Sequence, residues 1–305
     1  MLDAEGRSTD WSSERLPFEV GAIASPDGLK AGSVVATASG IYEIWISERD
    51  GSAARRFISR EGADCFSVVW SPDGATIAYG QTASSEEDGI YAMSADGTGP
   101  PRLLAKFPAD VNFIPTCWTP DGTRLLFTQA RGARFKVLSV ATTGPPTSAA
   151  AAESLFAGES GNHANAVLSP DSRLIAYQSD ESGQFQNYVR AWNGTAAVGE
   201  GIPVGKSGSF WIMWSRDGRK LLFLNEARKF VQVEILTQPR LAASAPRVLW
   251  SERDAKTIGD YMSALPDGRV LAVQKGETED DLNRFDLVLG FPKLLQQRLR
   301  QAGGK

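Results

Sequence analysis

The stretch Trp70-Ser71-Pro72-Asp73-Gly74-Ala75-Thr76-Ile77-Ala78-Tyr79 decides the fold, because its central Ser-Pro-Asp-Gly phrase recurs through the whole chain. The copies are Ser25-Pro26-Asp27-Gly28, Ser71-Pro72-Asp73-Gly74, Thr119-Pro120-Asp121-Gly122, Ser169-Pro170-Asp171-Ser172, Ser215-Arg216-Asp217-Gly218 and Leu265-Pro266-Asp267-Gly268. Their aspartates lie 46, 48, 50, 46 and 50 residues apart. A nearly constant period of this length is the signature of a repeat fold in which each copy builds one unit.

Each copy has the composition of a tight hairpin turn. Proline presets φ for a type I turn, aspartate tolerates the next position, and glycine supplies the positive φ that follows. The phrase therefore predicts a three-residue hairpin loop with a bulge at glycine. Ser172 replaces this glycine in the fourth copy, so we expect backbone strain there.

Strands are predicted on both sides of every turn. The position three residues before each aspartate carries Ala24, Trp70, Trp118, Leu168, Trp214 and Ala264 in turn. Apolar triplets such as Ile77–Tyr79 follow the turn, and runs that are apolar on both faces suit strands packed between neighbouring sheets. We interpret the recurrent tryptophans as packing residues between units rather than as an aromatic ligand box. A third strand and a weaker fourth strand follow, and four antiparallel strands per unit predict a propeller blade.

The fold prediction is an all-β, six-bladed β-propeller with four antiparallel strands per blade. The propeller is expected over residues 14–290, with blades at about 19–60, 64–107, 111–157, 162–205, 208–250 and 258–290. Glu14–Phe18 is predicted to supply the outer strand that the sixth blade lacks, which closes the ring and removes two open edges. Residues 291–305 are predicted to form a short C-terminal helix and tail, because Pro292 suits a first helical turn.

The W-S-P-D-G phrase, the triplet Ile77–Tyr79, the pair Ile90-Tyr91 and the turn Asp96-Gly97 together resemble the TolB-type β-propeller repeat, a WD40-like or PD40 repeat. The resemblance covers nearly the whole chain. The ending at residues 285–300 resembles that of TolB-type propellers found C-terminal to bacterial serine/threonine protein kinase domains. This resemblance implies a non-catalytic sensor module that binds a protein or small ligand, with a covalent N-terminal partner domain in the parent protein.

Composition and motifs argue against several other classes. A net charge of −4 and the lack of a basic tract argue against nucleic-acid binding. A single histidine, the lack of a G-x-S-x-G elbow and the lack of kinase motifs predict no catalytic residues, no metal and no cofactor. No apolar run is long enough to cross a membrane, and no signal peptide is expected at the N-terminus.

Two further expectations concern side chains with distinctive chemistry. Cys65 and Cys117 stand eight and four residues before their turn aspartates, an offset of about 13 Å along a strand. This separation exceeds the limit for a disulfide, so both are predicted to be free thiols. The small-residue stretch Thr142–Glu153 is expected to be an outer loop.

Candidate ligand-binding residues lie where the inner strands begin. Propellers bind ligands at the mouth of the central channel, where inner strands converge. The candidate rim, for which a merely solvated surface is the alternative, consists of Asp64, Asn112, Asn162, His163, Asp260 and Tyr261.

Two other functions remain open from the sequence. Asp64, Asn112, Asn162 and Asp260 resemble the ring of carboxylates and amides that holds a central metal in six-bladed lactonase-like hydrolases. A protein-interaction scaffold that docks partners on its faces is the second alternative.

Overall fold

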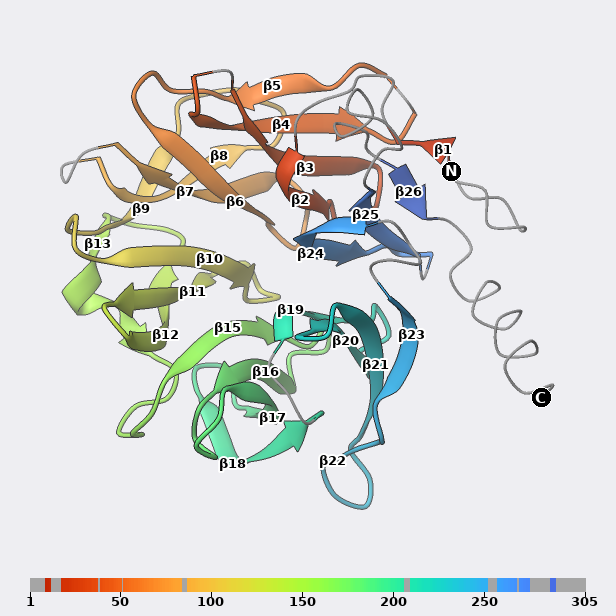
Figure 1. Ribbon diagram of the computed structural model, residues 1–305. Coiled ribbons are helices and arrows are strands. Elements are labelled where there is room, and N and C mark those ends of the chain that lie inside the picture. Colours follow the sequence, from red (N-terminus) through yellow and green to blue (C-terminus); the bar gives the residue numbers. More distant parts are fainter. Residues whose placement is uncertain are drawn as a thin grey trace.

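The computed structural model shows strands arranged as sheets around a common centre, with the first strand of each repeat innermost (Figure 1). It describes residues 9–11, 18–37, 39–50, 52–83, 87–205, 209–251, 257–267, 269–274 and 286–288. Within these ranges the single helical element is the 3-10 turn η1, Ala149–Ala151. The all-β propeller prediction is thus confirmed, whereas the helix expected over residues 291–305 lies outside the described residues.

The strands follow the repeats in order. The first three repeats form β2 (Phe18–Ala24), β3 (Lys30–Ala36), β4 (Tyr42–Glu48), β5 (Arg55–Ile58), β6 (Asp64–Trp70), β7 (Thr76–Thr82), β8 (Gly89–Ser94), β9 (Arg102–Lys106), β10 (Asn112–Trp118), β11 (Arg124–Arg131), β12 (Arg134–Ala141), β13 (Thr147–Ser148) and β14 (Glu153–Ser154). The last three form β15 (His163–Leu168), β16 (Leu174–Ser179), β17 (Gln186–Trp192), β18 (Ala197–Val204), β19 (Ser209–Trp214), β20 (Lys220–Asn225), β21 (Lys229–Leu236), β22 (Ala242–Ala243), β23 (Arg247–Ser251), β24 (Thr257–Ala264), β25 (Val270–Gln274) and β26 (Asp286–Val288).

The described strands form five blades, so the prediction of six is wrong. The first and sixth repeats share one eight-stranded sheet, in the order β1-β26-β25-β24-β2-β3-β4-β5. They are joined because β2 and β24 pair in parallel at Gly21 and Tyr261. Gly21 has a φ of +99° and lies within a register shift of β2. A residue without Cβ allows two backbones to approach closely, which explains why these two inner strands hydrogen-bond.

The N-terminus closes this sheet, at a different place from the one predicted. Strand β1 (Thr9–Asp10) pairs antiparallel with β26, with Thr9 opposite Leu287. Trp11 follows β1 directly and packs among Ala22, Leu265 and Leu271. Phe18, expected to end the closing strand, instead begins β2, and residues 14–17 lie outside the described ranges.

The recurrent turn is formed by the predicted residues, but its loop is one residue longer than predicted. Ser71 N donates to Thr76 O and Gly74 N donates to Ser71 O, so four residues lie between the paired ends of the hairpin instead of three. The Ser71 hydroxyl donates to Asp73 Oδ1 at 2.6 Å and accepts from Thr76 N at 2.9 Å. Ser172 has a φ of +58°, close to the +71° of Gly74, which confirms the left-handed backbone expected at that position.

The outer stretch of the third repeat is more regular than predicted. Within Thr142–Glu153, the short strand β13 pairs in parallel with β9 of the second repeat, at Thr147 opposite Ala105. The turn η1 and the strand β14 follow, and β14 pairs with β12. This segment therefore links two neighbouring sheets instead of projecting as a loop.

Candidate functional site

A cavity of about 380 Å³ lies at the ends of the inner strands, beside the recurrent turns. Side chains from strands β2, β6, β10, β15, β19 and β24 and from several of the turns line it. Four tryptophans and four turn prolines dominate the lining: Trp70, Trp118, Trp211, Trp214, Pro26, Pro72, Pro120 and Pro170. The tryptophan and proline positions of the repeat phrase thus line this mouth of the central channel in several repeats.

The tryptophans around this cavity are anchored to the backbone of neighbouring repeats. The indole Nε1 of Trp70 donates to Ile23 O at 2.9 Å, and that of Trp118 donates to Val69 O at 3.0 Å. Trp214 makes the equivalent bond to Val167 O at 3.2 Å. This geometry supports the interpretation of the tryptophans as packing residues, and it also fixes the orientation of the rings that face the channel.

Other groups join the repeats where this tryptophan is missing. Trp211 Nε1 donates to Met262 O at 3.0 Å across the boundary between the fifth and sixth repeats. Ser263 Oγ accepts from Ala24 N at 3.1 Å between the sixth and the first. Cys117 Sγ donates to Ala166 O at 3.8 Å between the third and the fourth. A side-chain to backbone bond therefore spans each of the boundaries at which tryptophan is replaced.

Arg216 is the one charged side chain among the described residues that line the cavity. It stands where the other copies of the turn have proline. Its guanidinium donates to Ala264 O at 3.2 Å and to Ser25 O at 3.5 Å. Burial beside the channel lowers the pKa of Arg216 from its ordinary value, although the group stays protonated at neutral pH. A guanidinium in apolar surroundings favours a carboxylate as an additional partner.

The candidate rim predicted from the sequence lies at the opposite ends of the inner strands. Asp64 begins β6 and its Oδ1 accepts from Tyr42 N at 3.0 Å. Asn162 precedes β15, and its Oδ1 accepts from Phe135 N at 2.8 Å. Both side chains thereby tie the start of an inner strand to the third strand of the preceding repeat. This bonding favours a structural role for Asp64 and Asn162 over the central metal ring of a lactonase-like hydrolase.

The remaining rim residues divide into three kinds. Asn112 begins β10 and is exposed. Asp260 and Tyr261 lie in β24, where only their backbone is described. His163 begins β15 but is 4% exposed and packs between sheets, stacked on Phe156 at a ring-centroid distance of 4.2 Å. The described side chains of Asn112 and His163 therefore differ in their surroundings, one being exposed and the other buried.

His163 belongs instead to a charged cluster that sequence reasoning missed. Its Nε2 lies 3.6 Å from Glu159 Oε2. Arg190 Nη1 lies 2.6 Å from Glu159 Oε1, and Arg190 Nη2 lies 3.5 Å from Glu181 Oε2. Burial lowers the pKa of His163, so its imidazole is neutral at pH 7. The available signal was Arg190 itself, a charge in the middle of the otherwise apolar run Tyr188–Trp192.

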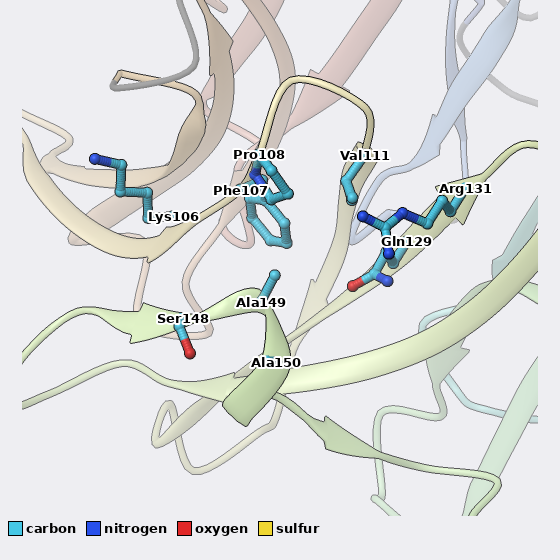
Figure 2. Close-up of a pocket in the computed structure, with 9 residues that line it drawn as sticks. All are labelled: Lys106, Phe107, Pro108, Val111, Gln129, Arg131, Ser148, Ala149 and Ala150. Atoms are coloured by element: carbon cyan, nitrogen blue, oxygen red, sulfur yellow. The ribbon is translucent and has the colours of Figure 1, made fainter.

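A second cavity, of about 540 Å³, lies between the second and third repeats (Figure 2). Phe107, Pro108 and Val111 approach it from the loop before β10, and Ala149 and Ala150 approach it from η1. Arg131 at its edge is paired with Asp110 at 2.7 Å. Arg131 is already paired with a carboxylate, whereas the bonds of Arg216 go to backbone carbonyls, so the channel mouth is the stronger candidate for an acidic ligand.

Among the described residues, no helix is long and apolar enough to cross a membrane.

Comparison with known proteins identifies the class through structure alone. No family model and no curated protein matches the sequence. A putative TolB from Agrobacterium tumefaciens superposes with a TM-score of 0.60 at 18% identity, covering 89% of each chain. TolB from Acinetobacter baumannii gives a TM-score of 0.57 at 17% identity, over 88% of this chain and 62% of that protein. A puromycin-hydrolyzing peptidase from Mycobacterium tuberculosis gives 0.54 at 14% identity, over 95% of this chain and 50% of that one.

At these identities the likeness establishes the fold and nothing more. The molecule is a β-propeller whose fold is similar to that of these TolB proteins, as the repeat phrase implied, although its described sheets number five and not six.

Proposed function

We propose that the chain is a non-catalytic binding propeller whose ligand is a segment of another protein, held at the turn-side mouth of the central channel. The observation that carries this proposal is the 380 Å³ cavity, in which tryptophan and proline side chains surround the single guanidinium of Arg216. Aromatic residues and arginine are the side chains that most often dominate binding energy at protein interfaces. The expected ligand is therefore an apolar or aromatic segment that carries a carboxylate.

The rigidity of the lining supports the same proposal. Each of Trp70, Trp118 and Trp214 is held by an indole hydrogen bond to a neighbouring repeat. Rings that are already fixed lose little side-chain entropy when a ligand covers them. The cavity volume lies within the range of ligand pockets, and it suits a few side chains of a partner rather than a whole domain.

Selection from a displayed peptide library against the immobilised protein tests the proposal. The enriched peptides should combine aromatic or aliphatic residues with an acidic residue or a free C-terminal carboxylate. Arg216→Glu should weaken their binding by about tenfold or more, because a repulsive carboxylate replaces the partner of the ligand's charge. Arg173→Glu is the matched control, since Arg173 lies at the turn of the preceding repeat and its side chain is 78% exposed. Equal losses in both variants would contradict a site at Arg216.

The finer role is that of a sensor at the C-terminal end of a larger bacterial protein such as a serine/threonine kinase. Its support is the resemblance of residues 285–300 to the ending of kinase-linked propellers, a segment of which the structure describes only residues 286–288. The reading frame of the parent gene tests this role. A kinase domain encoded upstream would support it, and a gene that encodes the propeller without one would contradict it.

The rim at the opposite mouth stays a second proposed contact surface. It comprises Asp64, Asn112, Asn162, His163, Asp260 and Tyr261. Asn112 is the rim residue best placed to meet a protein or small-molecule ligand, because it is exposed at the start of an inner strand.

A further inference from the structure

A charged cluster is built into the apolar boundary between the third and fourth repeats. Its members are Glu159, His163, Glu181 and Arg190, packed beside Phe156 and Tyr177. His163 and Arg190 are 4% and 6% exposed, while the side chains of Glu159 and Glu181 keep partial access to solvent. Burying charges is costly unless something compensates them, so such a cluster requires an explanation.

The third repeat builds the same place from apolar residues. Phe113 and His163 both stand eight residues before their turn aspartates. Phe107 stacks on Phe113 with a centroid distance of 4.2 Å and an angle of 14°, and Phe156 stacks on His163 with 4.2 Å and 13°. A phenylalanine therefore fills the equivalent position in the third repeat, so packing does not explain why the fourth repeat has a histidine there.

The imidazole presents an unused ligand atom to the two carboxylates. His163 Nε2 is buried and has no hydrogen-bond partner within the described part of the chain. Its 3.6 Å separation from Glu159 Oε2 is too long for a hydrogen bond. Two ligand atoms on one tetrahedral zinc ion lie about 3.4 Å apart, as bond lengths of 2.0 to 2.2 Å require. One ligand atom from each of Glu159, His163 and Glu181 lies within 4.8 Å of the other two.

Arg190 holds the carboxylates in this arrangement. It binds Oε1 of Glu159, which leaves Oε2 of the same carboxylate directed at the imidazole. Its guanidinium also lies over the rings of Phe156 and Tyr177, at 5.5 and 5.4 Å from their centroids. Residues that hydrogen-bond to ligating carboxylates in this way commonly fix the orientation of metal ligands.

Gly201 leaves room for the cluster. A Cβ at this position would lie 2.4 Å from the hydroxyl of Tyr177 and 3.0 Å from Oε1 of Glu181. The absence of a side chain at residue 201 thus permits Glu181 and Tyr177 to lie where they do, facing the histidine. A small shift of the partly exposed Glu181 is then sufficient to bring all three ligand atoms to one ion.

We propose that Glu159, His163 and Glu181 bind a divalent transition-metal cation, zinc by the chemistry of one imidazole and two carboxylates. The ion would join the loop that carries Glu159 to the start of β15 and to the turn after β16, at the boundary of the third and fourth repeats. A site with three protein ligands also leaves a coordination position for water. This site is separate from the channel mouth and does not depend on the function proposed there.

Zinc titration of the full chain tests the proposal. The protein is treated with EDTA, freed of the chelator, titrated with zinc in a calorimeter and then dialysed for metal analysis. One zinc ion per chain should bind and raise the midpoint of thermal unfolding, because a ligand that binds only the folded state stabilises it. Cobalt(II) in place of zinc should give the visible absorption of a low-symmetry site with nitrogen and oxygen ligands.

Three variants locate the ion. His163→Phe copies the third repeat and is expected to fold, yet it should lose the cobalt spectrum and weaken zinc binding by at least about tenfold. Glu159→Gln and Glu181→Gln should each weaken it as well. Glu87→Gln is the matched control, because Glu87 is an exposed glutamate that pairs with Arg60. Wild-type protein that retains no zinc, or a folded His163→Phe variant that binds zinc as tightly as wild type, would overturn the proposal.

Discussion

The indole of Trp118 donates its Nε1 hydrogen to the backbone carbonyl of Val69, 3.0 Å away, across the boundary between the second and third repeats. The bond is buried, so its loss leaves the carbonyl of Val69 without this donor. Replacing Trp118 by phenylalanine should lower the free energy of unfolding by about 1 to 3 kcal/mol, the usual cost of an unsatisfied buried group. Urea denaturation followed by circular dichroism measures the change.

Trp192→Phe is the control for this substitution. Trp192 is also buried, but the described structure gives its indole no bond to another repeat. A loss of stability in Trp192→Phe as large as that in Trp118→Phe would show that ring volume, and not the inter-repeat hydrogen bond, accounts for the effect.

Ser172 offers a stabilising substitution. Its φ of +58° places an L-amino acid in the left-handed region, where four other copies of the turn have glycine at +67° to +71°. Ser172→Gly should therefore raise the free energy of unfolding by about 1 kcal/mol. Gly122→Ala makes the converse test, because no atom lies within 4 Å of the added Cβ and only the backbone conformation opposes it. An unchanged or lower stability in Ser172→Gly would contradict the strain assigned to this turn.

The two cysteines should be unreactive in the folded protein. Both are free, as the strand offset predicted, and burial raises the pKa of the Cys65 thiol and of the Cys117 thiol to about 12. Since the thiolate is the reactive form, neither should react quickly with Ellman's reagent at pH 8. Both should react once the protein is unfolded in guanidinium. Rapid modification of one thiol in the native protein would show that its strand opens or that its burial is incomplete.

The recurrent aspartates should make the folded state sensitive to acid. Hydrogen bonds from Ser71 to Asp73, from Thr119 to Asp121 and from Ser215 to Asp217 are the main causes that hold these carboxyl pKa values below 3.8. A pKa that is lower in the folded state means that the stabilisation is complete above pH 3.8 and is lost as the pH falls below it.

The serine of one turn tests this pH dependence. Ser71→Ala removes the hydrogen bond to Asp73 and should cost about 1 kcal/mol at pH 7. The cost should be smaller near pH 2, because the carboxyl group loses its charge as the pH falls through its lowered folded-state pKa. Chemical denaturation of both proteins at the two pH values gives the comparison, and a cost that is the same at both would contradict the role assigned to the carboxylate.

The sequence of a single repeat was sufficient to predict the backbone of its turn and the burial of its strands. The positive φ at Ser172, the packing of the recurrent tryptophans and the buried apolar triplets all follow from residue types at fixed positions in one repeat. The sheet count was not accessible in this way. It depends on Gly21 lying beside Tyr261, a parallel pairing between opposite ends of the chain that no repeat motif encodes.

For the candidate sites too, the sequence predicted the positions of strands but not the contacts between distant segments. The repeat pattern located the inner strands, but it placed the rim at their beginnings, whereas the cavity with Arg216 lies at their ends. The cluster around His163 draws on a loop residue, Glu159, and on Arg190 of the third strand. The register between β15, β16 and β17 brings His163 near Arg190, and the loop before β15 adds Glu159, an arrangement that spacing along the chain does not reveal.

The binding proposal is tested most directly by calorimetry of one selected acidic peptide with wild-type protein, Arg216→Glu and Asn112→Ala. The two substitutions lie at opposite mouths of the central channel. We expect binding about tenfold weaker or worse for Arg216→Glu and unchanged for Asn112→Ala. Affinity that is lost in Asn112→Ala and retained in Arg216→Glu would place the ligand at the other mouth and contradict the proposed site.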